Sequence, residues 1–167
     1  MGSVLSGREI RDMILEGKLI REYIDLDKQL TPNGFDLSLR EIHIFKGQGY
    51  VDFSNKNRRV SETEPLDFKN ELFLSPGAYK IVYNEVVDLP NDILAIGRTR
   101  STLLRCGVSV SSAVFDAGYV GRCESLLLVN NPHGFKVEKD ARVLQLIFMR
   151  LSSLSEGYSG VYKGENI

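Results

Sequence analysis

The sequence predicts an all-β protein, built as a distorted β-barrel or jelly roll with one short α-helix at its N-terminus. Many short stretches of strand-forming residues are separated by turn residues at intervals of about 8 to 12 residues, a spacing typical of sandwiches and barrels. Strands and helices do not alternate along the chain, which argues against a parallel α/β sheet. The 167 residues contain neither a linker nor an internal repeat, so residues 1–167 are predicted to form a single domain.

The expected helix lies within residues 1–18. Ser6 and Glu9 have the S-x-x-E spacing of a capping box, in which each side chain accepts a hydrogen bond from the backbone N–H of the other residue. Three apolar residues follow at helical spacing and would form one buried face. Gly17 can end the helix, because glycine adopts the left-handed conformation without strain. We expect this helix to be a packing element rather than a site.

Most of the remaining chain is predicted to be β-strand. Residues 36–45 alternate between polar and apolar, but the phase slips by one residue, which predicts a β-bulge near Arg40 and Glu41. Further strands are expected at residues 71–74, 78–89, 93–97, 126–129 and 143–151, with shorter ones between 108 and 115. Residues 54–65 are polar and have no periodicity, so they are predicted to be an exposed loop.

The composition argues against several classes of partner. The formal net charge is −1, so no overall electrostatic attraction to nucleic acid or anionic membranes is expected. No signal peptide is evident, and no apolar stretch approaches the roughly 18 residues that a membrane helix needs. Cys106 and Cys123, both in predicted strands, lack the C-x-x-C spacing of a zinc or redox site and are expected to be buried, reduced thiols. We therefore expect a cytoplasmic protein that binds neither nucleic acid nor membranes.

The densest group of chemically active side chains lies between Gly97 and Gly121. Three arginines and three hydroxyls fall within eight residues, namely Arg98, Thr99, Arg100, Ser101, Thr102 and Arg105. Guanidinium groups suit phosphate oxygens because they present a rigid fork of charged donors. Asp116 then stands alone in an apolar segment, where a carboxylate could activate a water molecule. This pattern favours nucleotide hydrolysis, although the same arginines could instead form a solvated face.

The C-terminal segment, residues 155–167, has a different composition. It contains three glycines and two tyrosines and little apolar material to bury. One interpretation is a frayed terminus. The other is a flexible lid, in which Tyr158 and Tyr162 cover a base or sugar and Lys163 meets a phosphate.

Five segments, in this order, resemble the trimeric dUTPase and dCTP deaminase superfamily. They are residues 33–37 (N-G-F-D-L), 100–105 (R-S-T-L-L-R), 112–121 (S-A-V-F-D-A-G-Y-V-G), 140–147 (D-A-R-V-L-Q-L-I) and the tyrosine- and glycine-containing tail. The resemblance covers nearly the whole chain and implies a dUTPase-like fold. It also implies a homotrimer that builds each site from neighbouring subunits. The early helix and Arg105 resemble the deaminase branch, whereas S-A-V-F-D resembles the dUTPase form, a combination similar to the archaeal dUTPases.

The resemblance also implies roles for individual residues. Asp116 would be the catalytic carboxylate that orients or deprotonates the attacking water, and Tyr119 would lie under the deoxyribose. The other substrate-binding residues implied are Arg100, Ser101, Thr102, Arg105, Val114, Gln145, Tyr158, Tyr162 and Lys163. Asp36 would support the site through hydrogen bonds. Mg²⁺ is the implied cofactor, held mainly by the triphosphate and water molecules rather than directly by the protein.

The resemblance leaves more than one function open. The favoured one is Mg²⁺-dependent hydrolysis of dUTP to dUMP and diphosphate. Where the deaminases of this family carry a catalytic glutamate, this sequence has Leu126, and the nearest acid is Glu124. Both residues would share one face of a strand, so a dCTP deaminase or a bifunctional enzyme that uses Glu124 as its acid/base stays an alternative. A non-catalytic nucleotide-binding module is a third possibility.

Overall fold

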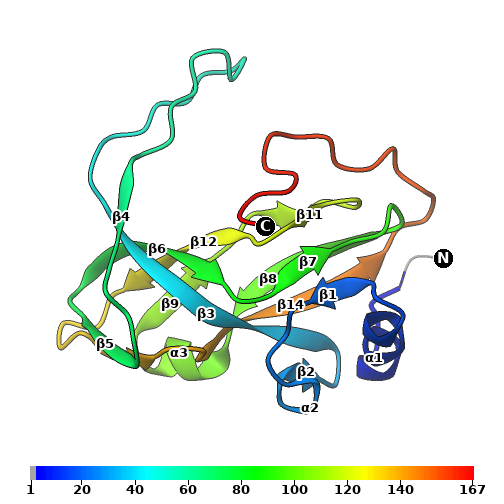
Figure 1. Ribbon diagram of the computed structural model, residues 1–167, viewed down its shortest axis with the longest axis horizontal. Helices are drawn as coiled ribbons and strands as arrows, with labels where there is room; N and C mark the ends of the chain where they lie inside the picture. The colour runs from blue at the N-terminus through cyan, green and yellow to red at the C-terminus, as the bar shows by residue number, and fades with distance from the viewer. Residues whose placement is uncertain (1–2) are drawn as a thin grey trace.

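The computed structural model describes residues 3–167, and most of their regular structure is β-strand (Figure 1). The helices are α1 (Gly7–Leu15), α2 (Leu26–Gln29) and α3 (Ser101–Arg105). The strands are β1 (Leu19–Arg21), β2 (Leu30–Thr31), β3 (Gly34–Phe45), β4 (Thr63–Pro65), β5 (Glu71–Leu74), β6 (Gly77–Tyr83), β7 (Val86–Asp88), β8 (Ile93–Thr99), β9 (Val108–Ser111), β10 (Val114–Phe115), β11 (Val120–Gly121), β12 (Glu124–Val129), β13 (Phe135–Glu138) and β14 (Arg142–Arg150).

These strands form three sheets. The largest has nine strands in the order β10-β8-β14-β3-β6-β12-β9, with β2 and β4 also paired to β3. A three-stranded sheet, β1-β7-β11, and a two-stranded sheet, β13-β5, complete the fold. The fully buried side chains come mainly from the long strands and include Phe35, Leu37, Ile81, Leu144, Leu146 and Phe148. The predicted all-β fold with a short N-terminal helix is confirmed.

The N-terminal helix has the predicted cap. The backbone N–H of Ser6 donates to the Glu9 carboxylate at 2.8 Å, and the Ser6 hydroxyl accepts from the backbone N–H of Glu9 at 3.4 Å. Gly17 follows the helix with φ +79°, in the left-handed region that glycine tolerates. Ile10 and Ile14 are buried against the core, so α1 is the packing element that its sequence predicts.

The predicted bulge in β3 is also present. The register of β3 against β6 shifts between Leu39 and Glu41, so one extra residue lies on the β3 side. Because the extra residue reverses the alternation, Leu39 and Ile42 can both face the core, and neither is exposed to solvent.

Three local features differ from the expectation. The single strand expected at residues 78–89 is two strands, β6 and β7, which break at the buried Glu85 and join different sheets. The Glu85 carboxylate accepts hydrogen bonds from the backbone N–H of Ser38 at 2.8 Å and from the Gln29 amide at 2.6 Å, and these contacts hold the break. The end of the loop expected at residues 54–65 forms β4 against β3. The arginine-rich segment contains the short helix α3.

Both cysteines were expected in strands, and neither lies in one. Cys106 follows the last residue of α3, and Cys123 lies between β11 and β12. Both are free thiols; Cys123 is buried and Cys106 is half-buried. Among residues 3–167, no helix is long and apolar enough to cross a membrane.

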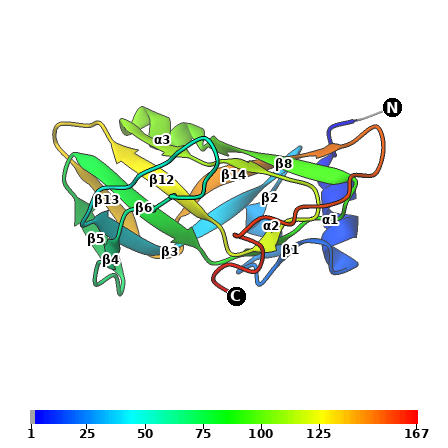
Figure 2. The ribbon, with the colours of Figure 1, turned by 90° about the horizontal axis from the view of Figure 1, so that it is seen from above.

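Two segments without long elements lie on the same side of the sheets. Residues 46–62, which we call the arm, rise from the ends of β3 and β4, and the tail of residues 155–167 crosses above β11 (Figures 1 and 2). The tail is hydrogen-bonded to the body: the N–H of Tyr158 donates to the carbonyl of Ala117 at 2.8 Å, and the N–H of Gly164 to that of Val120 at 2.7 Å. In this structure the tail therefore lies against the fold.

Candidate functional site

A cavity of about 200 Å³ opens where β10 and β12 meet the tail. Its lining residues are Ala113, Val114, Phe115, Asp116, Tyr119, Cys123, Glu124, Tyr158, Tyr162 and Glu165. Six of the residues predicted from the sequence are thus brought together: Val114, Asp116, Tyr119, Glu124, Tyr158 and Tyr162. They come from two strands, one turn and the tail, so the cavity depends on the way the tail lies.

Asp116 sits in the turn that follows β10 and is exposed to solvent. The turn is closed by the N–H of Tyr119, which donates to the carbonyl of Asp116 at 3.0 Å, and by Gly118, whose φ is +80°. A Cβ on Gly118 would approach Gly157 and the amide nitrogen of Tyr158 at less than 3 Å, so glycine also lets the tail pass closely. The Asp116 carboxylate is therefore held at the cavity with its oxygen atoms open to water.

Tyr119 forms the buried wall beside Asp116. Its ring packs edge-on against Phe115 and Tyr158, with centroid distances of 5.9 Å and 5.7 Å. Its hydroxyl donates to the Glu165 carboxylate at 2.7 Å. Burial raises the pKa of Tyr119, and the hydrogen bond to Glu165 raises it further, so the hydroxyl remains a neutral donor.

Glu165 brings a carboxyl group from the tail into this cavity. Burial raises its pKa; the hydrogen bond from Tyr119 acts in the opposite direction, and the nearby Glu124 carboxylate raises the pKa again. Lys163, which the sequence analysis places in the lid, is exposed, and its ammonium donates to the carbonyl of Tyr158 at 3.0 Å. In this structure Lys163 therefore holds the tail's own backbone.

A second group of predicted residues gathers around Asp36 on β3. The buried Asp36 carboxylate pairs with the guanidinium of Arg100 at 2.8 Å and with that of Arg142 at 3.3 Å. Burial raises the pKa of Asp36, and the two guanidinium groups act against that rise. Arg100 also donates to the carbonyl of Arg142 at 3.1 Å, so its position is fixed from two sides.

Gln145 on β14 lies in the same group. Its cross-strand neighbours in register are Asp36 on β3 and Arg98 on β8, so the three side chains form a row on one face of the sheet. The Gln145 amide donates to the hydroxyl of Thr31 at 2.6 Å. Arg98 is exposed and is a candidate phosphate ligand, although the sequence analysis counted it only within the arginine cluster.

Exposed residues of α3 complete this second group. Ser101, Thr102 and Arg105 are exposed on α3 directly after Arg100. Neither these residues nor Asp36 and Gln145 line the Asp116 cavity. Within one chain the candidate residues therefore form two separate groups, which we call the Asp116 half-site and the arginine half-site.

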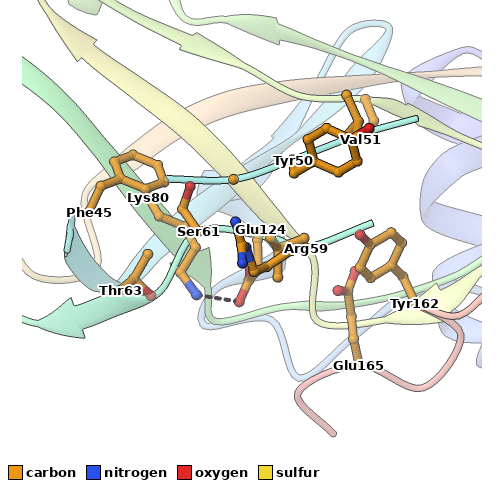
Figure 3. A pocket seen from close by; sticks show the side chains of 13 residues that line it. Phe45, Tyr50, Val51, Arg59, Ser61, Thr63, Lys80, Glu124, Tyr162 and Glu165 are labelled. Carbon is orange, nitrogen blue, oxygen red and sulfur yellow. Dashed lines mark hydrogen bonds and ion pairs between the residues drawn. The ribbon is translucent and has the colours of Figure 1, made fainter. Parts of the chain in front are cut away.

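A larger cavity of about 530 Å³ lies beneath the arm (Figure 3). It adjoins the first cavity, and the two share Ala113, Glu124, Tyr162 and Glu165. The Lys80 ammonium projects into it from β6 and pairs with the Glu124 carboxylate at 2.8 Å. Lys80 and Glu165 were not predicted from the sequence. A lysine in an alternating strand is ordinary, and its partner lies 44 residues away, so no local pattern reveals the pair.

The arm and the tail touch above these cavities. The guanidinium of Arg58 lies 5.4 Å from the centroid of the Tyr162 ring, a distance at which a cation is attracted to the face of an aromatic ring. Arg59, Tyr50 and Val51 of the arm line the larger cavity. The space around Lys80 and Glu124 is therefore partly covered on two sides.

Comparison with known proteins identifies the family. Residues 4–151 match the family described as dCTP deaminase-like. The chain belongs to that family. A "probable deoxyuridine 5′-triphosphate nucleotidohydrolase" of Archaeoglobus fulgidus is 52% identical to it over 165 residues, which cover 99% of this chain and 98% of the relative. A "deoxyuridine 5′-triphosphate nucleotidohydrolase" of Methanocaldococcus jannaschii is 32% identical over 158 residues, which cover 91% of this chain and 99% of the relative.

A solved structure confirms the fold. The 2′-deoxycytidine 5′-triphosphate deaminase of Agrobacterium tumefaciens superposes with a TM-score of 0.70 at 22% identity. The match covers 89% of this chain and 48% of that longer protein, so this chain spans about half its length. At this identity the likeness concerns the fold alone. The resemblance drawn from the five sequence segments is confirmed by the dCTP deaminase-like family and by these relatives.

Proposed function

We propose that this chain hydrolyses dUTP to dUMP and diphosphate, with Mg²⁺ as its cofactor. The observation that carries the proposal is that the exposed Asp116 carboxylate and the buried Tyr119 ring share one cavity. The names of the relatives from Archaeoglobus fulgidus and Methanocaldococcus jannaschii support the same substrate. An enzyme with this activity would act in the cytoplasm, where it would keep uracil out of DNA and supply dUMP for thymidylate synthesis.

Asp116 would act as the general base. Its exposed carboxylate can accept a proton from a water molecule as the water oxygen attacks the α-phosphorus of dUTP. The new bond joins the water oxygen to the α-phosphorus. The bond that breaks joins that phosphorus to the bridging oxygen, so diphosphate leaves and dUMP remains. The proton on Asp116 then returns to solvent.

Tyr119 would select the sugar. Its ring is fixed by the edge-on contacts with Phe115 and Tyr158, so it has little freedom to move aside. A deoxyribose lying against a ring held in this way leaves no room for a 2′-hydroxyl. The same cavity would therefore discriminate against ribonucleotides by shape.

We further propose that the active protein is a homotrimer with each site between two subunits. The arginine half-site and the Asp116 half-site are separate within one chain, so a neighbouring copy is needed to unite phosphate ligands with the base. Val114, Ile96 and Ile147 are paired in register across β10, β8 and β14, and Val114 and Ile96 are 56% and 38% exposed. An exposed apolar row of this kind is typical of a subunit interface.

The alternation of side chains links this row to the phosphate residues. Gln145 and Ile147 point to the same face of β14, as do Arg98 and Ile96 on β8. A second copy packed on the apolar row would therefore lie next to Gln145 and Arg98. This arrangement supports a site that is completed on assembly.

The residues of this chain fit a Mg²⁺ ion that arrives with the substrate. Among residues 3–167, no group of three or more histidine, cysteine, aspartate or glutamate side chains is arranged to hold a metal. Mg²⁺ in nucleotide sites is held largely by the substrate phosphates and water molecules, so an ion that arrives with the triphosphate needs no cage of protein carboxylates. When bound, the ion would neutralise the charge that develops on the phosphates.

One observation favours a second candidate function. Glu124 lines the same cavity as Asp116, so dCTP deamination, alone or together with dUTP hydrolysis, is the alternative. A purified sample with Mg²⁺ should be offered dUTP and dCTP separately, and dUMP, diphosphate and ammonia should be measured. Diphosphate and dUMP from dUTP would support the proposal, and ammonia from dCTP would support the alternative. No turnover of either nucleotide would favour a binding module.

A further inference from the structure

Lys80 is a half-buried cation that the proposed chemistry does not use. Its side chain is only 21% exposed, and its ammonium lies 2.8 Å from the Glu124 carboxylate, whose side chain is 35% exposed. Both residues line the cavity beneath the arm, and in Figure 3 their charged ends point toward one another between Thr63 and Arg59. Because Lys80 is largely enclosed and tied to one partner, its ammonium is held in one place inside the cavity.

The position of the pair along the cavity indicates what it would meet. If Asp116 faces the α-phosphorus and Tyr119 lies under the sugar, the base must extend away from Asp116. The cavity continues in that direction past Ala113 and Glu124, which line both of its parts, and reaches Lys80. A base that extends into this second part of the cavity would bring its exocyclic edge toward the pair.

Uracil and cytosine differ at that edge. Position 4 of uracil carries a carbonyl oxygen, which accepts hydrogen bonds, whereas position 4 of cytosine carries an amino group, which donates them. A lysine ammonium has three donors and no acceptor. An ammonium therefore binds the uracil edge and opposes the cytosine edge.

Glu124 alone would have the opposite preference. A free carboxylate only accepts hydrogen bonds, so it would attract the amino group of cytosine. Because Lys80 donates to one oxygen of Glu124, it both neutralises that carboxylate and presents its own remaining donors. We propose that Lys80, held by Glu124, reads position 4 of the base and makes the pocket select uracil over cytosine. This inference rests on the proposed dUTP site.

An ordinary cross-strand ion pair is the competing explanation. In the register of β6 and β12, Lys80 lies opposite Leu126 and Glu124 lies opposite Val82, so the two charged residues are diagonal neighbours. A pair with only that role would affect stability, and loss of either partner would have the same consequence. A base-reading pair has different consequences, because each remaining partner prefers a different nucleotide.

The test replaces each partner by methionine, which is apolar and similar in length. The affinities for dUMP and dCMP are measured by calorimetry, and kcat/KM for diphosphate release is measured with dUTP and dCTP. In Lys80→Met the preference for uracil is expected to fall by about 10- to 100-fold, the range for loss of one charge-assisted hydrogen bond. In Glu124→Met the preference is expected to stay within about threefold of wild type or to rise, because the ammonium remains.

Arg59→Met is the matched control, since it removes the same charge from the lining of the same cavity. Its preference is expected to stay within about twofold of wild type. Equal preferences in wild type and Lys80→Met, or equal losses in Lys80→Met and Glu124→Met, would overturn the inference. If Lys80→Met does not fold, Lys80→Gln applies the same test, because an amide can turn its acceptor toward cytosine.

The calorimetric measurements separate this inference from the proposed function. If wild type binds dUMP more tightly than dCMP but turns over no dUTP, the hydrolase proposal fails, and the comparison of variants still decides the role of Lys80. If wild type hydrolyses dUTP and Lys80→Met keeps the wild-type preference for uracil, the hydrolase proposal stands and the role of Lys80 is rejected.

Discussion

Replacing Glu165 by alanine is expected to lower KM for dUTP by about fivefold and to leave kcat within about twofold. Glu165 lines both cavities and accepts the hydrogen bond from Tyr119 at 2.7 Å, so it occupies space beside the ring on which the sugar would rest. An intramolecular hydrogen bond contributes about 0.5–1.5 kcal/mol net, so about 1 kcal/mol is expected for this half-exposed contact. Loss of about 1 kcal/mol raises the fraction of molecules with an undocked tail about fivefold. Because Glu165 then no longer competes for the space beside Tyr119, we expect KM for dUTP to fall by the same factor.

The same contact predicts a pH dependence. The pKa of Glu165 is raised in the docked tail, first by burial, so the docked state binds the proton more tightly than the undocked state. Docking is therefore strongest below the ordinary glutamate pKa and weakens as the pH rises through the raised value. Alanine at this position cannot titrate, so the difference between variant and wild type should shrink as the pH rises.

Limited proteolysis of the tail and steady-state kinetics measure these effects. The ratio of the cleavage rates of Glu165→Ala and wild type is taken at each pH, which cancels the pH dependence of the protease. Glu156→Ala is the control, because it removes an exposed carboxylate of the same tail that lines neither of the two cavities. A higher KM in Glu165→Ala than in wild type would refute the reasoning, since Glu165 would then assist binding instead of competing with it.

Three further outcomes are expected. Asp116→Asn should lower kcat by about 10²- to 10⁴-fold, the range for loss of a general base, while calorimetry shows dUMP affinity within about threefold of wild type. Asp36→Ala should lower the free energy of unfolding in urea by about 2–3 kcal/mol, because the buried carboxylate pairs with the half-exposed Arg100, and it should also raise KM. Ile96→Asp should convert an assembly of several chains into a species of 18.8 kDa by analytical ultracentrifugation. Leu15→Asp, at an apolar position 66% exposed on α1, should leave the assembly intact.

Local sequence patterns predict much of this fold because they depend on few distant contacts. The capping box of Ser6 and Glu9 involves residues three apart, and it is present in the structure. The bulge after Leu39 follows from the phase of the apolar residues within a single strand, and it too is present. Such features can be predicted because their energetic causes lie within the segment itself.

Other features depend on partners far along the chain. The only local interruption between β6 and β7 is the polar pair Asn84 and Glu85, which by itself does not send the two strands to different sheets. The break depends on hydrogen bonds from Ser38, which lies 47 residues earlier. The pair of Lys80 and Glu124 is hidden for the same reason, as is Glu165, whose partner Tyr119 lies 46 residues away. The resemblance named many of the candidate residues, but it could not supply these contacts.

The placement of the two half-sites argues that substrate binding and assembly are coupled. The face that carries the exposed Ile96 also carries Arg98 and Gln145, whereas Asp116, Tyr119 and Lys80 lie around cavities formed within one chain. A separated subunit should therefore keep its contacts to base and sugar but lose its neighbour's phosphate ligands. It should bind dUMP almost as well as the assembly does and bind dUTP much more weakly. If Ile96→Asp weakened both nucleotides equally, the phosphate ligands would have to come from the same chain, and the site would not lie between subunits.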